Sequence, residues 1–174
     1  MKTLIALTLL CIAPALYAQE AANPVVSSAR EIYDRQSKFI VAAAELMPED
    51  KYGYHPTPDQ WSYGKIIAHV AQSDFGICAM LSGTPATSIP KVTETSSKAE
   101  LVAAVKASFD YCDKAMAGLQ DAQLGDTITF FRGAKKPRAR ALIEITGDLE
   151  DHYSQMAGYL RMNNLLPPSA APKK

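Results

Sequence analysis

The chain has 174 residues, 48% of them hydrophobic, and its 18 basic and 18 acidic side chains cancel to a formal net charge of zero. This size and composition predict one ordinary globular domain and exclude an intrinsically disordered chain. The balanced charge argues against bulk electrostatic attraction to nucleic acid or to an anionic membrane, so we expect neither as a partner.

The N-terminal segment is typical of a secretory signal peptide. Residues 1–18 have a basic residue near the start, an apolar run from Leu4 to Ile12 and small residues ahead of Gln19. Cleavage after Ala18 leaves 17 basic and 18 acidic residues. The sequence therefore predicts an exported protein, periplasmic or secreted. No later apolar run is long enough to cross a bilayer, so we expect no membrane association after the signal is removed.

The first predicted helix begins at Val25, and Pro48 ends it because proline cannot continue a helix. Its apolar residues recur at spacings of three and four, the pattern of one buried helical face. The residues at 48–60 are rich in Pro, Gly and Asp and predict an ordered connecting loop. A second helix is expected over about 62–81, with His69 beside its apolar face.

Ser97 is placed to cap a third helix with the same apolar spacing. Further along, the run Thr127–Phe131 is β-prone but has no evident strand partner, so we expect an extended loop there. The last helix is expected over about 138–163, with His152 in the middle of its apolar face. Two consecutive prolines then prevent its continuation.

Four amphipathic segments without a credible set of strands predict an all-α fold, a four-helix bundle. We place this single domain at residues 23–168 and a flexible C-terminal tail at 169–174. The sequence contains no internal repeat and no sign of a second domain.

Two stretches of the sequence are characteristic when taken together with the four-helix order. They are HPTPDQWSYGKIIAHVAQSD, at the entry to the second helix, and EDHYSQMAGYLRMNNLLPPS, in the fourth. With these motifs the chain resembles the DinB-like family of metal-dependent four-helix-bundle proteins over nearly its whole mature length. The resemblance implies the bundle fold, and a homodimer would be in keeping with it.

The resemblance also implies a metal site. In the family, one histidine of the second helix and two of the fourth, four residues apart, typically hold a divalent metal. The matching positions here are His69, Asp148 and His152, so that Asp148 stands where the family usually has a histidine. Residues at i and i+4 share a helix face, so Asp148 and His152 can converge on one ion. Two imidazoles and a carboxylate leave coordination positions open and suit Zn, Ni, Mn or Fe.

The first functional hypothesis is an exported DinB-like protein that binds a divalent metal and supports hydrolase- or transferase-type chemistry on an unknown small substrate. A bound metal would activate water or a thiol for such a reaction. No separate catalytic base is evident in the sequence.

Two alternatives stay open at this point. One is a noncatalytic periplasmic bundle, a binding or structural module with a degenerate metal site. In it His69 and His152 are core residues that hydrogen-bond to each other, to Asp148 or to Gln36. The other is a metal-free protein that binds a small molecule in a pocket lined by Tyr and Met. His55, in the Pro-rich loop, is expected to have a surface or loop-packing role.

Cys78 and Cys112 remain after signal removal, in a chain sent to a compartment where disulfides persist. The long loop after the second helix allows the second and third helices to run parallel, as in the resembled fold, and the two cysteines then lie at one level. A bridge between them also requires that their Cβ atoms face each other, which the sequence does not decide.

Overall fold

Four long helices dominate residues 22–172, the part of the chain that the computed structural model describes. These helices confirm the predicted all-α four-helix bundle. The predicted signal peptide, residues 1–18, lies outside the described residues. The helices are α2 (Pro24–Leu46), α3 (Tyr63–Ser82), α4 (Lys98–Met116) and α5 (Ala139–Met162).

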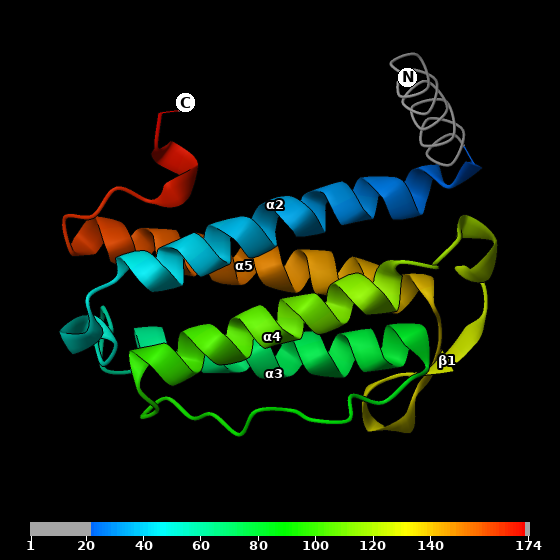
Figure 1. Ribbon diagram of the computed structural model, residues 1–174, viewed down its shortest axis with the longest axis horizontal. Helices are drawn as coiled ribbons and strands as arrows, with labels where there is room; N and C mark the ends of the chain where they lie inside the picture. Colours follow the sequence, from blue (N-terminus) through cyan, green and yellow to red (C-terminus); the bar gives the residue numbers. More distant parts are fainter. Residues whose placement is uncertain (1–21, 173–174) are drawn as a thin grey trace, which may run out of the picture.

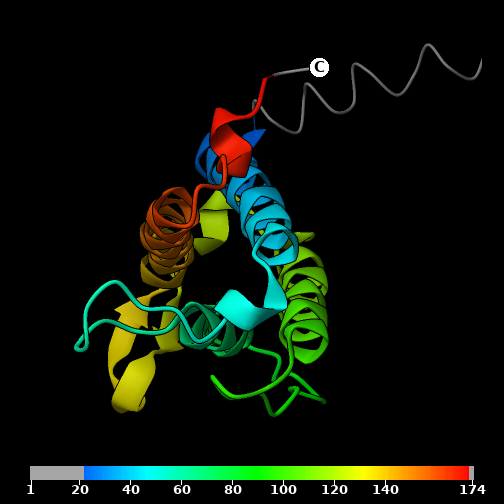
Figure 2. The ribbon, with the colours of Figure 1, turned by 90° about the vertical axis from the view of Figure 1, so that its left-hand side faces the viewer.

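The helices are arranged as two parallel pairs. α2 and α5 run in one direction along the bundle, and α3 and α4 run in the other (Figure 1). The loop 83–97 returns along the side of the bundle, which makes α3 and α4 parallel as the sequence had suggested. Seen from one end, the four helices surround a common core, and the segment between α2 and α3 crosses that end (Figure 2).

Short polar motifs set the helix boundaries. The Ser62 hydroxyl accepts a hydrogen bond from the backbone N–H of Lys65 at the start of α3. Ser97 and Glu100 form a reciprocal capping box at the start of α4, as the predicted Ser97 cap requires. At the end of α3, Gly83 adopts φ 74°, a left-handed conformation that glycine reaches without steric cost.

The core is continuous and mostly apolar, and two tyrosines tie the α2–α3 loop into it. Tyr52 and Tyr63 are buried and donate hydrogen bonds to the carbonyls of Ala44 and Ala43, at 2.7 and 2.8 Å. Because these hydroxyls have acceptors, their burial adds apolar contact without an unpaired donor. The largest fully buried side chains include Tyr33, Ile40, Ile66, Ile67, Leu81, Leu101, Ile145 and Leu149.

The β-prone run after α4 does have a strand partner, so the predicted extended loop at Thr127–Phe131 was wrong. β1 (Thr127–Thr129) pairs antiparallel with β2 (Lys135–Pro137), with Ile128 opposite Lys136. The partner reads Lys-Lys-Pro, which has little strand propensity and therefore gave no sequence signal. The hairpin forms because Ile128 is buried against the bundle.

The first residues of the predicted flexible tail are ordered by contacts with the bundle. Pro168–Ala170 form a single helical turn, and the Ser169 backbone N–H donates to the Tyr153 hydroxyl at 2.8 Å. In addition, no helix within residues 22–172 has both the length and the apolarity needed to cross a membrane.

Cys78 of α3 and Cys112 of α4 form a disulfide, with their Cα atoms 5.3 Å apart. Both cysteines are fully buried. The bridge joins the two parallel helices and closes the chain across a sequence separation of 34 residues. It restricts the unfolded chain and so stabilises the fold, by about 3–4 kcal/mol for a loop of this length.

Gly64 lies at the tightest point of the bundle end, which gives a test of the fold. A Cβ atom at this position would lie 2.9 Å from the Glu94 carbonyl oxygen and 3.3 Å from that of Tyr52. Both are backbone atoms, so we expect Gly64→Ala to lower the free energy of unfolding by about 1–3 kcal/mol. Urea denaturation measures this change.

Gly76, in the same helix, is the matched control. A Cβ atom there meets nothing within 4 Å, so Gly76→Ala should raise stability by about 0.5–1 kcal/mol. Equal stability of the two alanine variants would contradict the close backbone approach at Gly64.

Candidate metal centre

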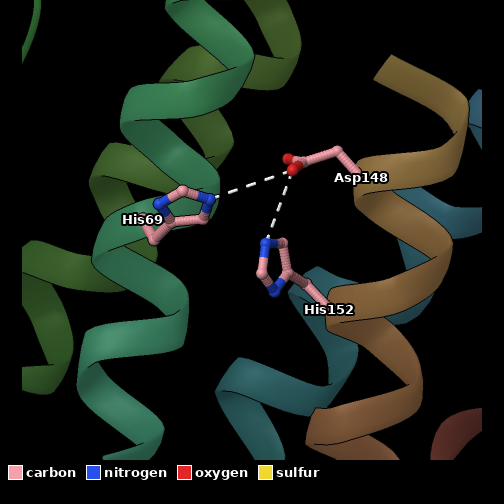
Figure 3. Close-up of side chains that lie close together, drawn as sticks. All are labelled: His69, Asp148 and His152. Carbon is pink, nitrogen blue, oxygen red and sulfur yellow. Dashed lines mark ion pairs between the residues drawn. The ribbon is translucent and has the colours of Figure 1, made fainter. Parts of the chain in front are cut away.

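Three predicted ligands converge between α3 and α5. His69 projects from α3 toward Asp148 and His152 of α5 (Figure 3). Oδ1 of Asp148 lies 3.8 Å from Nε2 of His69 and 3.5 Å from Nε2 of His152. One donor atom from each residue lies within 4.8 Å of the other two. The structure therefore brings together all three residues that the resemblance assigned to the metal site.

Local structure explains the convergence. Asp148 and His152 are four residues apart on α5 and share one face. Ser73, one turn after His69 on α3, donates its hydroxyl to Oδ2 of Asp148 at 2.9 Å. This bond fixes the carboxylate and leaves Oδ1 facing both histidines.

The centre is reached from solvent on the His69 side. The side chain of His69 is 39% exposed, whereas those of Asp148 and His152 are 19% and 8% exposed. Partial burial of Asp148 disfavours its charged form, but His152, His69 and Ser73 favour that form more strongly. The pKa of Asp148 is consequently well below its ordinary value, and the carboxylate stays ionised as a metal ligand must.

The donor set fits a small divalent ion. Ligands about 2.1 Å from a tetrahedral zinc ion are separated from one another by about 3.4 Å, close to the two histidine–aspartate distances. These distances exceed the usual 2.7–3.2 Å of an N–H···O hydrogen bond. Nδ1 of His152 is also buried without a hydrogen-bond partner. The two ring nitrogens that face Asp148 therefore lie farther from it than an ordinary hydrogen bond requires.

Trp61 covers this centre, and the sequence analysis missed its role. Its ring lies 5.0 Å from the His69 ring and 6.1 Å from the His152 ring, nearly parallel to the latter at 15°. The carbonyl of Trp61 accepts a hydrogen bond from the Tyr159 hydroxyl at 2.9 Å. Trp61 precedes α3, so helical spacing gave no signal for this position.

Two other residues weighed in the sequence lie outside the cluster. Gln36 donates to Oε1 of Glu150 at 3.5 Å, and its own Oε1 has no partner, so it does not hydrogen-bond to a histidine. His55 is in the loop before α3, where its ring bonds the Thr57 carbonyl at 2.8 Å. Neither residue belongs to the candidate centre, which consists of His69, Asp148 and His152.

A second group of ligand-type residues is buried deeper, at Asp74, Cys78 and Cys112. Because the two sulfurs form a disulfide, they are not available as thiolate ligands. Asp74 is fully buried and accepts hydrogen bonds from the Tyr33 hydroxyl at 3.2 and 3.3 Å. Burial raises the pKa of Asp74 to about 8, so the carboxyl is protonated and neutral at pH 7.

Comparison with known families gives one match. A family model described as the DinB superfamily matches residues 32–156. This range contains all four long helices except the first turns of α2 and the last turns of α5. No curated protein sequence matches the chain significantly.

Solved structures share the fold at low sequence identity. A DinB-like protein from Bacillus cereus ATCC 10987 is 15% identical, with a TM-score of 0.66 over 82% of this chain and 95% of its own. A DinB-like protein from Bacillus subtilis is 16% identical, with a TM-score of 0.60 over 77% of this chain and 92% of its own. These likenesses show a common fold.

An enzyme with the same bundle is also among the matches. A mycothiol-dependent maleylpyruvate isomerase is 16% identical, with a TM-score of 0.62 over 75% of this chain. The chain spans about 60% of the length of that isomerase.

The raised pKa of Asp74 predicts a pH dependence of stability. Between the ordinary carboxyl pKa, near 4, and about 8, the folded protein keeps a proton that the unfolded chain has lost. Stability from this group is therefore full below pH 4 and falls as pH rises to about 8, by about 1 kcal/mol per pH unit.

Asp74→Asn removes the titration and keeps an acceptor for Tyr33. Urea unfolding of both proteins from pH 4 to 8 should show the native protein losing stability relative to the variant. A constant difference across this range would mean that Asp74 is ionised in the folded protein.

Proposed function

The chain belongs to the DinB superfamily, and on that basis we propose that it is an exported member that binds one divalent metal ion through His69, Asp148 and His152. The observation that carries the proposal is the convergence of the three donor atoms within 4.8 Å. The hydrogen bond from Ser73 to Asp148 supports it further. In metal sites, such a hydrogen bond from a neighbouring residue fixes the orientation of the ligand.

A divalent metal held by two imidazoles and a carboxylate would supply Lewis acidity for hydrolase- or transferase-type chemistry on a small substrate. Ser73 holds the Asp148 carboxylate, and the Trp61 ring shields the two histidines from water on one side. The half-exposed His69 leaves an approach for the substrate. The fold shared with a mycothiol-dependent isomerase makes a thiol one class of substrate to screen.

The rival function is a noncatalytic bundle in which the same cluster has only a structural role. Asp148, in place of the family's usual histidine, favours that view. Against it, Nε2 of His69 and Nε2 of His152 lie 3.8 and 3.5 Å from Asp148, which is long for a hydrogen bond. A site that had become purely structural should have paired these groups.

Export is the part of the proposal that rests on the sequence of residues 1–18. The Cys78–Cys112 disulfide supports it, because disulfides persist mainly in oxidising compartments. We expect the mature protein, recovered from the cell envelope or medium, to begin at Gln19 when its N-terminus is sequenced. A mature chain that still begins at Met1 would contradict export by this signal.

Metal binding is tested by elemental analysis of the tag-free mature protein. After incubation with Zn, Ni, Mn or Fe salts and removal of excess metal, we expect about one metal ion per chain. His69→Ala and His152→Ala should each abolish binding, since a two-donor site of this kind holds a metal weakly.

Ser73→Ala should weaken metal affinity by about 10–100-fold, because it releases the Asp148 carboxylate. Ser37→Ala is the matched control, since the Ser37 hydroxyl bonds only the Asp34 carbonyl on the exposed side of α2. If the native protein takes up none of the four metals, the noncatalytic bundle is the better account.

A further inference from the structure

Asp74 is a fully buried acid whose partners in the disulfide-bonded protein are weak. The Tyr33 hydroxyl lies 3.2 and 3.3 Å from its two carboxyl oxygens, whereas an ordinary O–H···O hydrogen bond spans 2.5–3.0 Å. Hydrogen bonds from Ser108 and Tyr33 favour the ionised carboxylate, but burial outweighs them. A carboxyl placed in this way destabilises the fold, so its presence calls for a reason other than stability.

The disulfide is the neighbour that gives Asp74 a chemical context. One carboxyl oxygen of Asp74 and the sulfurs of Cys78 and Cys112 all lie within 4.8 Å of one another. Asp74 and Cys78 are four residues apart on α3 and share a face, and Cys112 approaches from α4. Sγ of Cys112 also lies 3.6 Å from the backbone carbonyl oxygen of Asp74. All three residues are fully buried.

This group repeats the arrangement of the candidate metal centre one helix further along. There, two ligands four residues apart on α5 face one ligand from α3, and here, two residues four apart on α3 face one from α4. The donors and the access differ. The candidate centre has imidazoles and a solvent-exposed side, whereas this group has sulfurs and is closed to solvent.

We propose that reduction of the Cys78–Cys112 disulfide creates a second, buried metal site, in which the two thiolates and the Asp74 carboxylate bind one Zn²⁺ ion. A dithiol gives two electrons and two protons to the disulfide and becomes a disulfide itself, which leaves two protein thiols. Binding of Zn²⁺ then releases the protons of both thiols and of the Asp74 carboxyl to the solvent. This site is independent of the proposed function at His69.

The donors suit zinc in a structural role. Thiolates about 2.3 Å from a tetrahedral zinc ion are about 3.8 Å apart, a separation within the 4.8 Å that the three donors already span. Closed burial is typical of structural zinc sites, which keep no position open for a substrate. Tyr33 would orient the Asp74 carboxylate as Ser73 orients Asp148.

The disulfide and the metal are alternative occupants of the same place. Each joins α3 to α4, so a zinc ion would keep the two helices linked when the covalent bridge is absent. Bound zinc would also hold both sulfurs as metal ligands and so slow their oxidation. The buried acid thus acquires a role in the reduced protein that it lacks in the oxidised one.

Cobalt is the probe, because Co²⁺ bound by thiolates gives a near-ultraviolet sulfur-to-cobalt charge-transfer band that imidazole and carboxylate ligands do not give. The signal-free chain is unfolded in urea, refolded with a dithiol and freed of reductant without air. Titration with Co²⁺ should then produce the band at about one ion per buried site, and excess Zn²⁺ should remove it. The oxidised protein should give no such band.

Variants assign the ligands. Cys78→Ser should abolish the band, and Asp74→Asn should weaken Co²⁺ affinity at least as much as loss of an outer hydrogen-bond partner does, by about 10–100-fold. Asp113→Asn is the matched control, since Asp113 is an exposed acid next to Cys112 in α4. His69→Ala should leave the band unchanged, which separates this site from the candidate centre.

Each outcome decides the proposal. A band that needs reduction, Cys78 and Asp74 supports the buried site, whatever metal content the oxidised protein shows. Absence of the band in the reduced chain overturns it. A band whose affinity Asp74→Asn and Asp113→Asn leave equally unchanged also overturns it, because thiolates of an unfolded chain would then account for the binding. Far-ultraviolet circular dichroism of each sample records whether the helices are present.

Discussion

The packing of α3 against its neighbours is the constraint on which the rest of the structure depends. α3 is buried on several sides, and its second residue, Gly64, packs against the backbone of two loops. One side of the helix is joined to α4 through Cys78, and another faces α5 through His69 and Ser73. A shift of α3 along its axis would therefore disturb the core, the disulfide and the candidate centre together.

Asp148, which stands where the family usually has a histidine, changes the charge and the ligand type of the candidate centre but not its position. Three neutral imidazoles leave both charges of a divalent ion uncompensated, whereas one carboxylate neutralises one of them. Carboxylate oxygen is also a harder ligand than imidazole nitrogen and moves preference toward ions such as Mn²⁺.

Much of the architecture could be predicted from residue spacing, because α2, α4 and α5 each bury one dominant face. The apolar faces near His69 and His152 and the cap at Ser97 followed from local patterns, whereas the parallel α3–α4 pair was suggested by the long loop before α4 and by the family resemblance. The hairpin did not, since its second strand is held by Ile128 and the bundle surface rather than by its own Lys-Lys-Pro sequence. Strand propensity depends on the residues of the strand itself, whereas β2 is stabilised by its tertiary contacts, so its sequence did not predict it.

The candidate centre, like the fold, could be predicted from the sequence only in part. Helical spacing predicted that Asp148 and His152 share a face, and the resemblance assigned His69, which the structure places beside them. Metal binding itself stays a prediction. Trp61 escaped notice because it precedes α3, in a loop whose path over the histidines no periodic pattern describes. Asp74 escaped notice because α3 is buried on more than one face, where a polar residue no longer marks the solvent side.

The disulfide also determines how the protein responds to proteolysis. Residues 78–112 form a closed covalent ring, and the crossover loop inside that ring is largely exposed. Proteases cut preferentially in such loops. A single cut between α3 and α4 would leave both halves of the chain linked through Cys78 and Cys112, with the core around them still packed. A nicked molecule would thus keep its histidines and its carboxylate in one piece, and would lose integrity only after reduction.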